Sequence, residues 1–600
     1  MDSTPHKLLL RIPKQTRDNL SFAEPSEKGI ARWIANLPKA NIGETARQLY
    51  QGLIELNQYD MPAELRLAIL ERIRPEVHYV CTSLSKYYLG QAIVLEERPR
   101  KVANLSQSLQ NHLANGYKIV VAQERTLKAR EHGELFTLAI QRAMRSLCGP
   151  LLRAYQLYCP VAEGIWLELH QLYQLARHRK IHDLPVADPL SRNQAPLSIE
   201  HCYLSALLMG AAQPNQMRQS AMARLFTTLE DWCQLASLVP ASDSSSLLIV
   251  NPTVDSAPRY RSLLQNEDLS HSLGLDTHHL VEGIKQHMLN GGEASLVVPE
   301  SLGVELLQHL SQSWGDLAER TFNRVPGRGT LKVSIGMSAT HFRIAKRAFA
   351  RFINADEQQL NPFSDVAQRA RHGAGWGSAF DGDRSVEWVS SDYQAIDYTP
   401  GASVLQRENS EAEENEASYP IHELPIVNHS PGGFCLTWPK EVPKQLQAGE
   451  LLSVQEAREQ DWSLAVVRWI RQVRGGGTQM GVELIAPHCT PCAVKLVRKT
   501  GEPSHFLRAL MLPAVSAIDR PATLITPRLP FQVNSKVIIH LGSHELRGHL
   551  TDRVAATGSF NQFEYRVLEQ PKSGKSHSET HSTSLGTGSE DDFDSLWKSL

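Results

Sequence analysis

The sequence is poor in the features that mark secreted and membrane-spanning proteins. It has only 8 cysteines in 600 residues, at irregular spacings, which indicates the reduced thiols of a cytoplasmic protein rather than a disulfide framework. No apolar run approaches the length of a membrane span, and the N-terminal "MDSTPHKLLLRIPKQ" is too weakly apolar for a signal peptide. We therefore expect a cytoplasmic protein without membrane insertion.

An excess of charge of one sign is also missing. Lys and Arg together number 62 and Asp and Glu together number 64. The net charge of the molecule therefore does not attract DNA, RNA or an anionic membrane, and we expect neither DNA nor RNA as a partner. Any anion site must be local.

The sequence shows no pattern typical of catalysis or of metal binding. It contains no Ser-His-Asp order, P-loop or zinc-protease motif. Cys489 and Cys492 have the spacing of half a zinc site or of a redox pair, but the second half and the βαβ context are missing, so buried structural thiols are the simpler interpretation. His540, His544 and His549 lack a carboxylate partner at ligand spacing. We expect no enzyme, no metal and no cofactor.

Apolar periodicity divides the chain into helical and strand-rich parts. Leu65, Ile69 and Ile73 predict a helix that begins after Pro62 and stops at Pro75. Consecutive helix pairs of this kind suit either a solenoid or an ordinary bundle. Alternating apolar residues after 330 and again after 419 predict strands.

The predicted fold class is α+β multidomain, an N-terminal all-helical region followed by two small β-barrel-like domains, because 600 residues exceed what one core supports. The expected parts are an N-terminal extension (1–28), one or more helical domains, possibly solenoid-like (29–240), a mixed connecting region (241–320), a first barrel (321–500) with an insertion (344–418), a second small β-domain (501–571) and a disordered tail (572–600).

A forked basic loop precedes the first of these strands. In "RVPGR" the residues Arg324 and Arg328 flank Pro326 and Gly327, which disfavour a regular helix and favour a turn. The strand predicted over 330–342 follows at once. Two guanidinium groups are therefore expected at the mouth of a β-element.

A second candidate motif is "NHSPGG". Asn428 and Ser430 are two residues apart, so on an extended chain they project from the same face, and Gly433 leaves backbone open to a ligand. Taken alone, the stretch could equally be a turn, since Asn, Ser, Pro and Gly are common turn residues.

Taken together, the two motifs resemble the signature of the PilZ domain, a bacterial cyclic di-GMP-binding β-barrel. That signature is an arginine, three residues and an arginine before the first barrel strand, then a D/N-x-S-x-x-G turn. "AVVRW" (465–469) and "GVEL" (481–484) are similar to later strands of the family. The resemblance implies that residues 321–500 form a PilZ-like barrel in a regulatory protein whose ligand-binding residues are Arg324, Arg328, Asn428, Ser430 and Gly433.

The chemistry of these residues suits a cyclic dinucleotide. A guanidinium group can bind a phosphate or the O6/N7 edge of guanine through paired hydrogen bonds. Asn428 can bond a guanine edge and Ser430 can donate to phosphate or base. An Asp in place of Asn428 would match the guanine donors better.

The spacing departs from the family pattern, because about 100 residues separate Arg328 from Asn428. An insertion over 344–418 would account for the distance at little entropic cost. A rival placement starts the barrel near Tyr419 and leaves it without the arginine pair. The alternative function is then a degenerate PilZ-like scaffold that mediates protein contacts and binds no nucleotide.

The chain ends in a candidate partner-binding segment. Phe593, Leu596, Trp597 and Leu600 recur at i, i+3, i+4 and i+7, which is one apolar face of a helix. A stripe on a polar tether is typical of a helix that docks in a groove, either of an unidentified protein partner or of the chain's own N-terminal helical region. The alternative is an idle tail, since so short a helix is unstable alone.

Overall fold

The computed structural model describes twelve stretches of the chain, from residue 10 to residue 568. They are residues 10–124, 133–191, 195–243, 246–265, 267–290, 296–315, 324–353, 418–439, 441–456, 461–497, 504–514 and 521–568. The C-terminal stripe Phe593, Leu596, Trp597 and Leu600 lies outside them, as does most of the predicted insertion.

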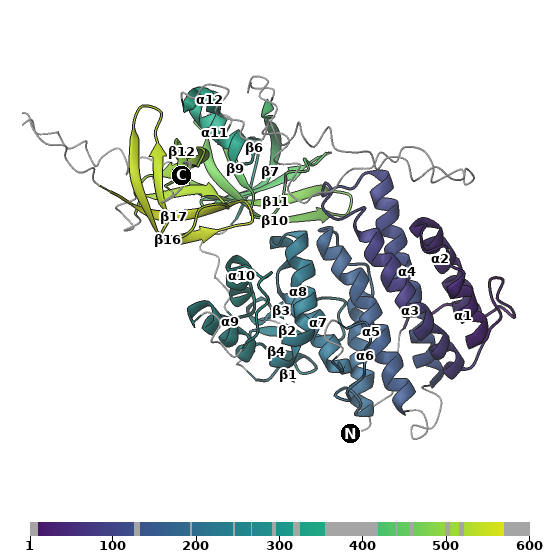
Figure 1. Cartoon of the computed structure of the whole chain (residues 1–600). Helices are drawn as coiled ribbons and strands as arrows, with labels where there is room; N and C mark the ends of the chain where they lie inside the picture. Colours follow the sequence, from purple (N-terminus) through teal and green to yellow (C-terminus); the bar gives the residue numbers. More distant parts are fainter. Residues whose placement is uncertain are drawn as a thin grey trace, which may run out of the picture.

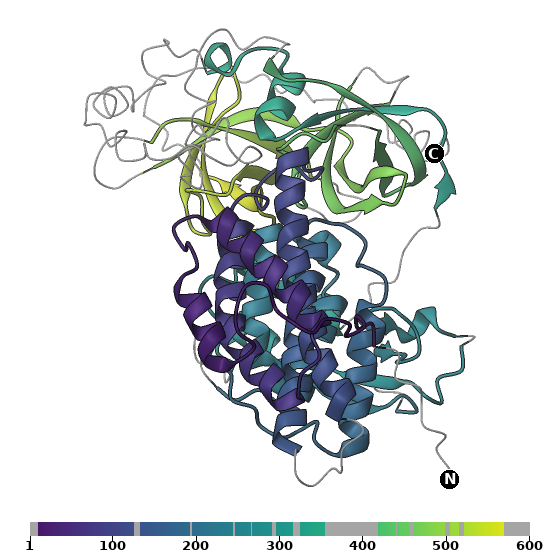
Figure 2. The same ribbon diagram turned by 90° about the vertical axis from the view of Figure 1, so that its right-hand side faces the viewer.

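The N-terminal part is helical, and the two barrels lie over one end of its helices (Figure 1, and Figure 2 from the side). The helices are α1 (Glu27–Ala35), α2 (Ile42–Gln58), α3 (Ala63–Ser85), α4 (Glu97–Glu124), α5 (Gly133–Gln156), α6 (Ile165–Arg179), α7 (Ile199–Ala211) and α8 (Gln219–Trp232). The predicted all-helical N-terminal region is confirmed.

The helices pack as a bundle. Helix α4 contacts α2, α3 and α5, and α5 in turn contacts α6, α7 and α8. In a solenoid each repeat would contact only its neighbours. Buried ion pairs brace the bundle, among them Lys118 with Glu168 at 2.8 Å and Arg74 with Asp188 at 2.7 Å.

Helix α3 corrects the prediction that Pro75 ends a helix. The helix runs through Pro75 to Ser85. Ile73 and Val77, on either side of the proline, are buried in the core. Tertiary packing of this face outweighs the lost hydrogen bond, which costs about 3 kcal/mol in an isolated helix.

A small mixed layer follows the bundle. The antiparallel sheet has the order β1-β4-β2-β3 and is accompanied by α9 and α10. Trp314 of α10 donates its indole N–H to the Leu208 carbonyl of α7 at 3.1 Å, so this layer is fastened to the bundle. The bounds are β1 (Ser237–Pro240), β2 (Leu248–Val250), β3 (Arg259–Tyr260), β4 (Leu273–Asp276), α9 (His278–Asn290) and α10 (Val304–Gly315).

The first barrel has the strand order β5-β7-β6-β9-β10-β11-β8 and closes where β7 pairs with β8. Its apolar core is continuous with that of the helical bundle. The strands are β5 (Val325–Pro326), β6 (Thr330–Ile335), β7 (His422–Ser430), β8 (Gly433–Trp438), β9 (Leu451–Glu456), β10 (Ser463–Val473) and β11 (Gly477–Ala486).

The second barrel is closed in the order β12-β13-β14-β17-β16-β15. Strand β12 pairs with β13 and β15, so it belongs to this barrel, although the predicted boundary at 501 assigned it to the first. The pairing could not be read from the strand alone. The strands are β12 (Thr490–Leu496), β13 (Leu507–Leu512), β14 (Thr523–Pro527), β15 (Lys536–His540), β16 (Glu545–Ala556) and β17 (Phe560–Val567).

Two short helices lie between the barrels, where the sequence predicted a strand to 342 and then an insertion. Strand β6 ends at Ile335, and Gly336, with φ of 93°, turns the chain into α11 (Met337–Ala345), which α12 (Phe349–Phe352) follows. Phe349 and Phe352 are buried with Ala493 of the second barrel. Residues 344–353 are therefore part of the folded domain, and 354–417 lie outside the described residues.

Candidate functional site

The arginine loop is built into the first barrel. Val325 pairs with His429 and Pro326 with Asn428 of β7, so Arg324 enters the barrel at β5 and Arg328 lies in the loop between β5 and β6. A Cβ on Gly327 would lie 2.3 Å from Ile426 Cγ2, so only glycine lets the loop approach β7 this closely. The rival placement of the barrel start near Tyr419 is therefore wrong.

The second motif forms the hairpin between β7 and β8. Ser430 pairs with Gly433 across the turn at Pro431 and Gly432. Gly433 has φ of 152°, and a Cβ there would lie 2.0 Å from the Val482 carbonyl oxygen. The position requires glycine because β8 approaches β11 closely, which is a structural reason beside the ligand-binding one expected from the sequence.

Part of the predicted site comes together in space. Arg324 Nη1 donates to Asn428 Oδ1 at 3.3 Å, which joins the two halves of the motif. Ser430 projects from the same face of β7 as Asn428, two residues on. The Arg328 side chain is exposed and, among the described residues, its guanidinium group has no hydrogen-bond partner.

Trp469 and Arg471, which neither motif includes, extend this face. Asn428 is paired with Cys435, Cys435 with Gly481, and Gly481 with Trp469, so these residues form one row across the barrel and face the same side. The Trp469 indole covers Gly481, whose absent Cβ would lie 2.0 Å from Trp469 Nε1.

Arg471 lies next to this indole. Its guanidinium carbon is 5.3 Å from the centre of the Trp469 ring, and its Nη2 donates to Gln479 Oε1 at 2.7 Å. The side chain of Arg471 is exposed while that of Trp469 is half-buried. The row ends in an aromatic ring with a cation above it, a surface on which a nucleobase can stack.

Two arginines lie close enough to this row for their charges to act on Cys435. Burial raises the pKa of the Cys435 thiol, and the charges of Arg324 and Arg471 act to lower that pKa. The two guanidinium groups belong to segments far apart in sequence, yet both act on one thiol. The sequence signal for Trp469 and Arg471 was present in the strand "AVVRW" and its continuation, but nothing in it showed which face they share with Asn428.

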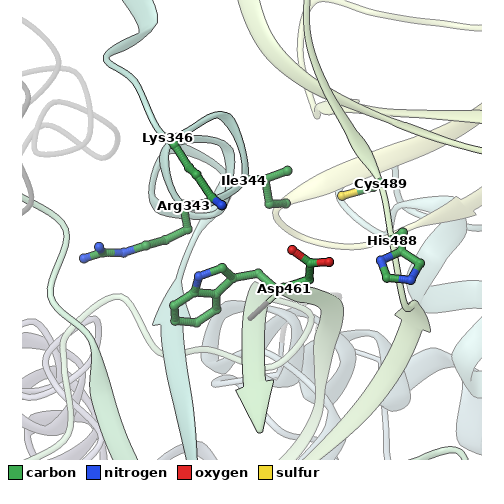
Figure 3. A pocket seen from close by; sticks show the side chains of 7 residues that line it. Arg343, Ile344, Lys346, Asp461, His488 and Cys489 are labelled. Atoms are coloured by element: carbon green, nitrogen blue, oxygen red, sulfur yellow. The ribbon is translucent and has the colours of Figure 1, made fainter. Parts of the chain in front are cut away.

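A separate small pocket lies between α11 and the loops that precede β10 and β12 (Figure 3). Its volume of about 220 Å³ is below the range of roughly 300–1,000 Å³ that is usual for small-molecule sites. None of the predicted ligand residues lines it. The lining residues are Arg343, Ile344, Lys346, Asp461, Trp462, His488 and Cys489.

Of the cysteines and histidines singled out in the sequence, Cys489, Cys492 and His540 are buried or half-buried, while His544 is exposed. Cys492 is buried, and burial raises the pKa of the Cys489 thiol to about 12. His540 is buried and lies 3.2 Å from the Phe352 carbonyl oxygen through Nε2. The described residues contain no group of three His, Cys, Asp or Glu side chains placed to hold a metal ion, and no described helix has the length and apolar character to cross a membrane.

Comparison with known proteins gives one consistent result along the whole chain. The family described as "Cyclic-di-GMP receptor FimW, N-terminal domain" matches residues 28–242, its "middle PilZ domain" matches 247–491, and the "FimW C-terminal beta-barrel domain" matches 492–568. A protein of Pseudomonas aeruginosa named "Cyclic-di-GMP receptor FimW" is 52% identical over 612 residues, which cover 100% of both chains. No solved structure matches the chain.

Proposed function

Because the chain belongs to the cyclic-di-GMP receptor FimW family, we propose that it is itself a cyclic di-GMP receptor, with the dinucleotide bound on the outer face of its PilZ barrel. The observation that carries this assignment is the contact of Arg324 with Asn428 at 3.3 Å, which joins two half-motifs about 100 residues apart. The contact brings the two half-motifs onto one face, as a ligand that bonds both of them requires.

Each residue of the face has a chemical role in the proposal. Arg324 and Arg328 are forked donors that match a phosphate or the guanine O6/N7 edge. Asn428 and Ser430 bond a base edge or a phosphate oxygen. Gly433 keeps the hairpin close to β11 and leaves its backbone open to the ligand.

We extend the site to Trp469 and Arg471. The indole offers an apolar face for one guanine, and the guanidinium beside it adds positive charge for a phosphate. The ligand is a dianion, so a row with arginines at both ends supplies the charge that the nearly neutral chain lacks overall.

The protein acts by binding and population shift, without turnover. Ligand binding changes how the helical region presents itself to a protein partner, and the C-terminal stripe Phe593, Leu596, Trp597 and Leu600 is the partner-binding segment. The cytoplasm is the proposed location, in keeping with the eight cysteines, all of which lie among the described residues and are free.

Calorimetric titration of the full-length protein with cyclic di-GMP tests the site. Arg324→Ala or Arg328→Ala removes a charge-assisted contact worth about 1.5–3 kcal/mol, so the affinity should fall about ten- to a hundredfold. Arg324→Lys keeps the charge but loses the fork and should bind less well than the parent. Binding should also weaken as salt is raised.

The control is Arg547→Ala, a change of an exposed arginine on β16 of the second barrel, which should leave binding unchanged. If both Arg324→Ala and Arg328→Ala bind as tightly as the parent, the site is wrongly placed. If the folded parent does not bind cyclic di-GMP at all, the scaffold interpretation replaces the receptor.

A further inference from the structure

Strand β10 takes part in two contacts at once. Trp469 and Arg471 lie on its ligand face, and the next residue, Gln472, is bonded to the helical bundle. The hairpin of β10 and β11 extends from the barrel over the end of the bundle (Figure 1). The same short segment therefore belongs to the proposed ligand site and to the interface between domains.

Gln472 holds two separate segments of the bundle. Its backbone N–H donates to the Tyr158 carbonyl at 2.8 Å, and its Nε2 donates to the carbonyls of Ile93 at 2.9 Å and Leu157 at 3.0 Å. Ile93 follows α3 and Leu157 follows α5. A side-chain amide is needed here, because a carboxylate would face two carbonyl oxygens with nothing to donate.

The anchor continues into the bundle through Tyr158. This residue is buried, has φ of 54°, and donates its hydroxyl to the Met217 carbonyl at 2.8 Å. Met217 precedes Arg218, the N-terminal cap of α8. The chain segment that receives Gln472 is thus tied to the start of α8.

Arg218 makes a second attachment to the same part of the barrel. Its Nε donates to the Ala448 carbonyl at 3.1 Å, and its Nη2 lies 3.4 Å from the Glu450 carboxylate. The Glu450 carbonyl accepts from the Val467 N–H of β10 at 2.9 Å. Ser559 of the second barrel also bonds both Arg218 and Glu450, so this junction joins all three domains.

The ligand-facing residues lie between these two attachments. Val467, with Glu450 and Arg218 behind it, is on one side of Trp469, and Gln472 with its carbonyl partners is directly beyond Arg471. A shift of the bundle relative to the barrel must move β10 at one or both points. The position of the Trp469 ring therefore depends on how the bundle is seated.

We propose that Gln472 is a positioning residue that couples cyclic di-GMP occupancy of the barrel face to the seating of the helical bundle on β10. The coupling rests on the proposed function, since it concerns that same site. The coupling is reciprocal because the two equilibria are linked. If the Gln472 anchor raises the affinity for the ligand by some factor, the bound ligand raises the equilibrium constant for forming the anchor by the same factor. Occupancy of the face is in this way passed to the connection between α3 and α4 and to the C-terminal end of α5.

The test compares full-length parent, Gln472→Ala and Gln472→Glu by calorimetric titration with cyclic di-GMP. Both variants leave every proposed ligand contact in place, yet the affinity should fall by about five- to 150-fold, the usual range of coupling between sites. Gln286→Ala, a change of an exposed glutamine on α9, is the matched control and should bind like the parent.

Hydrogen exchange gives a second measurement, and its arm on the parent does not depend on the variants folding well. In the parent, cyclic di-GMP should slow exchange at 470–473 and also in the bundle at 154–159 and around residue 93. In Gln472→Ala the protection should remain within the barrel only. If Gln472 had only a structural role, adding cyclic di-GMP would not change hydrogen exchange in the bundle.

The outcomes separate the two claims. A parent that binds, with Gln472→Ala binding equally well and no ligand-dependent protection at 154–159, overturns the coupling and leaves the receptor intact. A parent that fails to bind overturns the receptor and the coupling together. If Gln472→Ala does not fold, protection at 154–159 in the parent alone decides for or against the coupling.

Discussion

Gly481 offers a way to move the Trp469 ring without changing any residue that would contact the ligand. A Cβ at residue 481 would lie 2.0 Å from Trp469 Nε1 and 2.2 Å from its Cε2. Carbon contacts are favourable at about 3.5–4.0 Å, so Gly481→Ala must displace the indole by at least about 1.5 Å. Trp469 is half-buried on the outer face, so the ring can tilt toward solvent while the barrel core on the other face stays packed.

The expected size follows from the stacking role. Stacking of one base on an aromatic side chain contributes about 1–3 kcal/mol, so Gly481→Ala should weaken cyclic di-GMP binding by about five- to 150-fold. Calorimetric titration gives the affinity, and thermal unfolding shows whether the barrel is intact. Trp469→Ala should show a loss of similar size, and the double variant little more than either alone, since both remove one stacking surface.

The control is Gly133→Ala at the start of α5, where an added Cβ has no neighbour within 4 Å among the described atoms. It should bind like the parent. Parent-like affinity in both Gly481→Ala and Trp469→Ala would refute the stacking surface and restrict the site to the arginine loop and the β7–β8 hairpin.

Two further predictions concern regions remote from this face. Burial lowers the pKa of His170 to about 4 from its usual 6.5, so below pH 6.5 the unfolded chain takes up a proton at this residue that the folded chain does not. His170 alone should therefore lower the free energy of unfolding by about 3 kcal/mol as the pH drops from 6.5 to 4. Urea unfolding followed by far-UV circular dichroism measures this, and an equally steep fall in His170→Gln would contradict it. Truncation to residues 1–588 removes Phe593, Leu596, Trp597 and Leu600 and should abolish capture of a protein partner from lysate while cyclic di-GMP binding is kept. An unchanged set of captured proteins would show that the stripe is idle.

Elements whose apolar pattern is local were predictable from the sequence. The helices around Leu169 and Leu229 and the strands around Val466 and Val537 carry their period in their own residues, and the structure has them. The two half-motifs of the PilZ signature were readable for the same reason, because each is a short run with a fixed spacing.

The features that were missed depend on contacts between distant segments. Helix α3 continues past Pro75 because its residues on both sides of the proline are packed in the core. The basic stretch around Phe349 is helical because the Phe349 ring packs on the second barrel, where the guanidinium carbon of Arg508 lies 4.5 Å from the ring centre. Trp469 joins the site only through the pairing of β10, β11, β8 and β7. No spacing along the chain indicates that row.

The residues on either side of 354–417 explain how the two widely separated half-motifs come together. Tyr419, the second residue after the described chain resumes, has its ring 5.1 Å from that of Phe342 in α11, and its carbonyl accepts a hydrogen bond from Arg343. Val333 of β6 pairs directly with His422 of β7 nearby. The described residues on either side of 354–417 thus lie close to α11 and α12, so β6 and β7 pair as they would with a short connection. Since doubling a loop adds only about 0.6 kcal/mol of closure entropy, the length between these points has little effect on the barrel. What defines the motif is the pairing of β5 with β7, which brings Arg324 to Asn428 however long the intervening chain is.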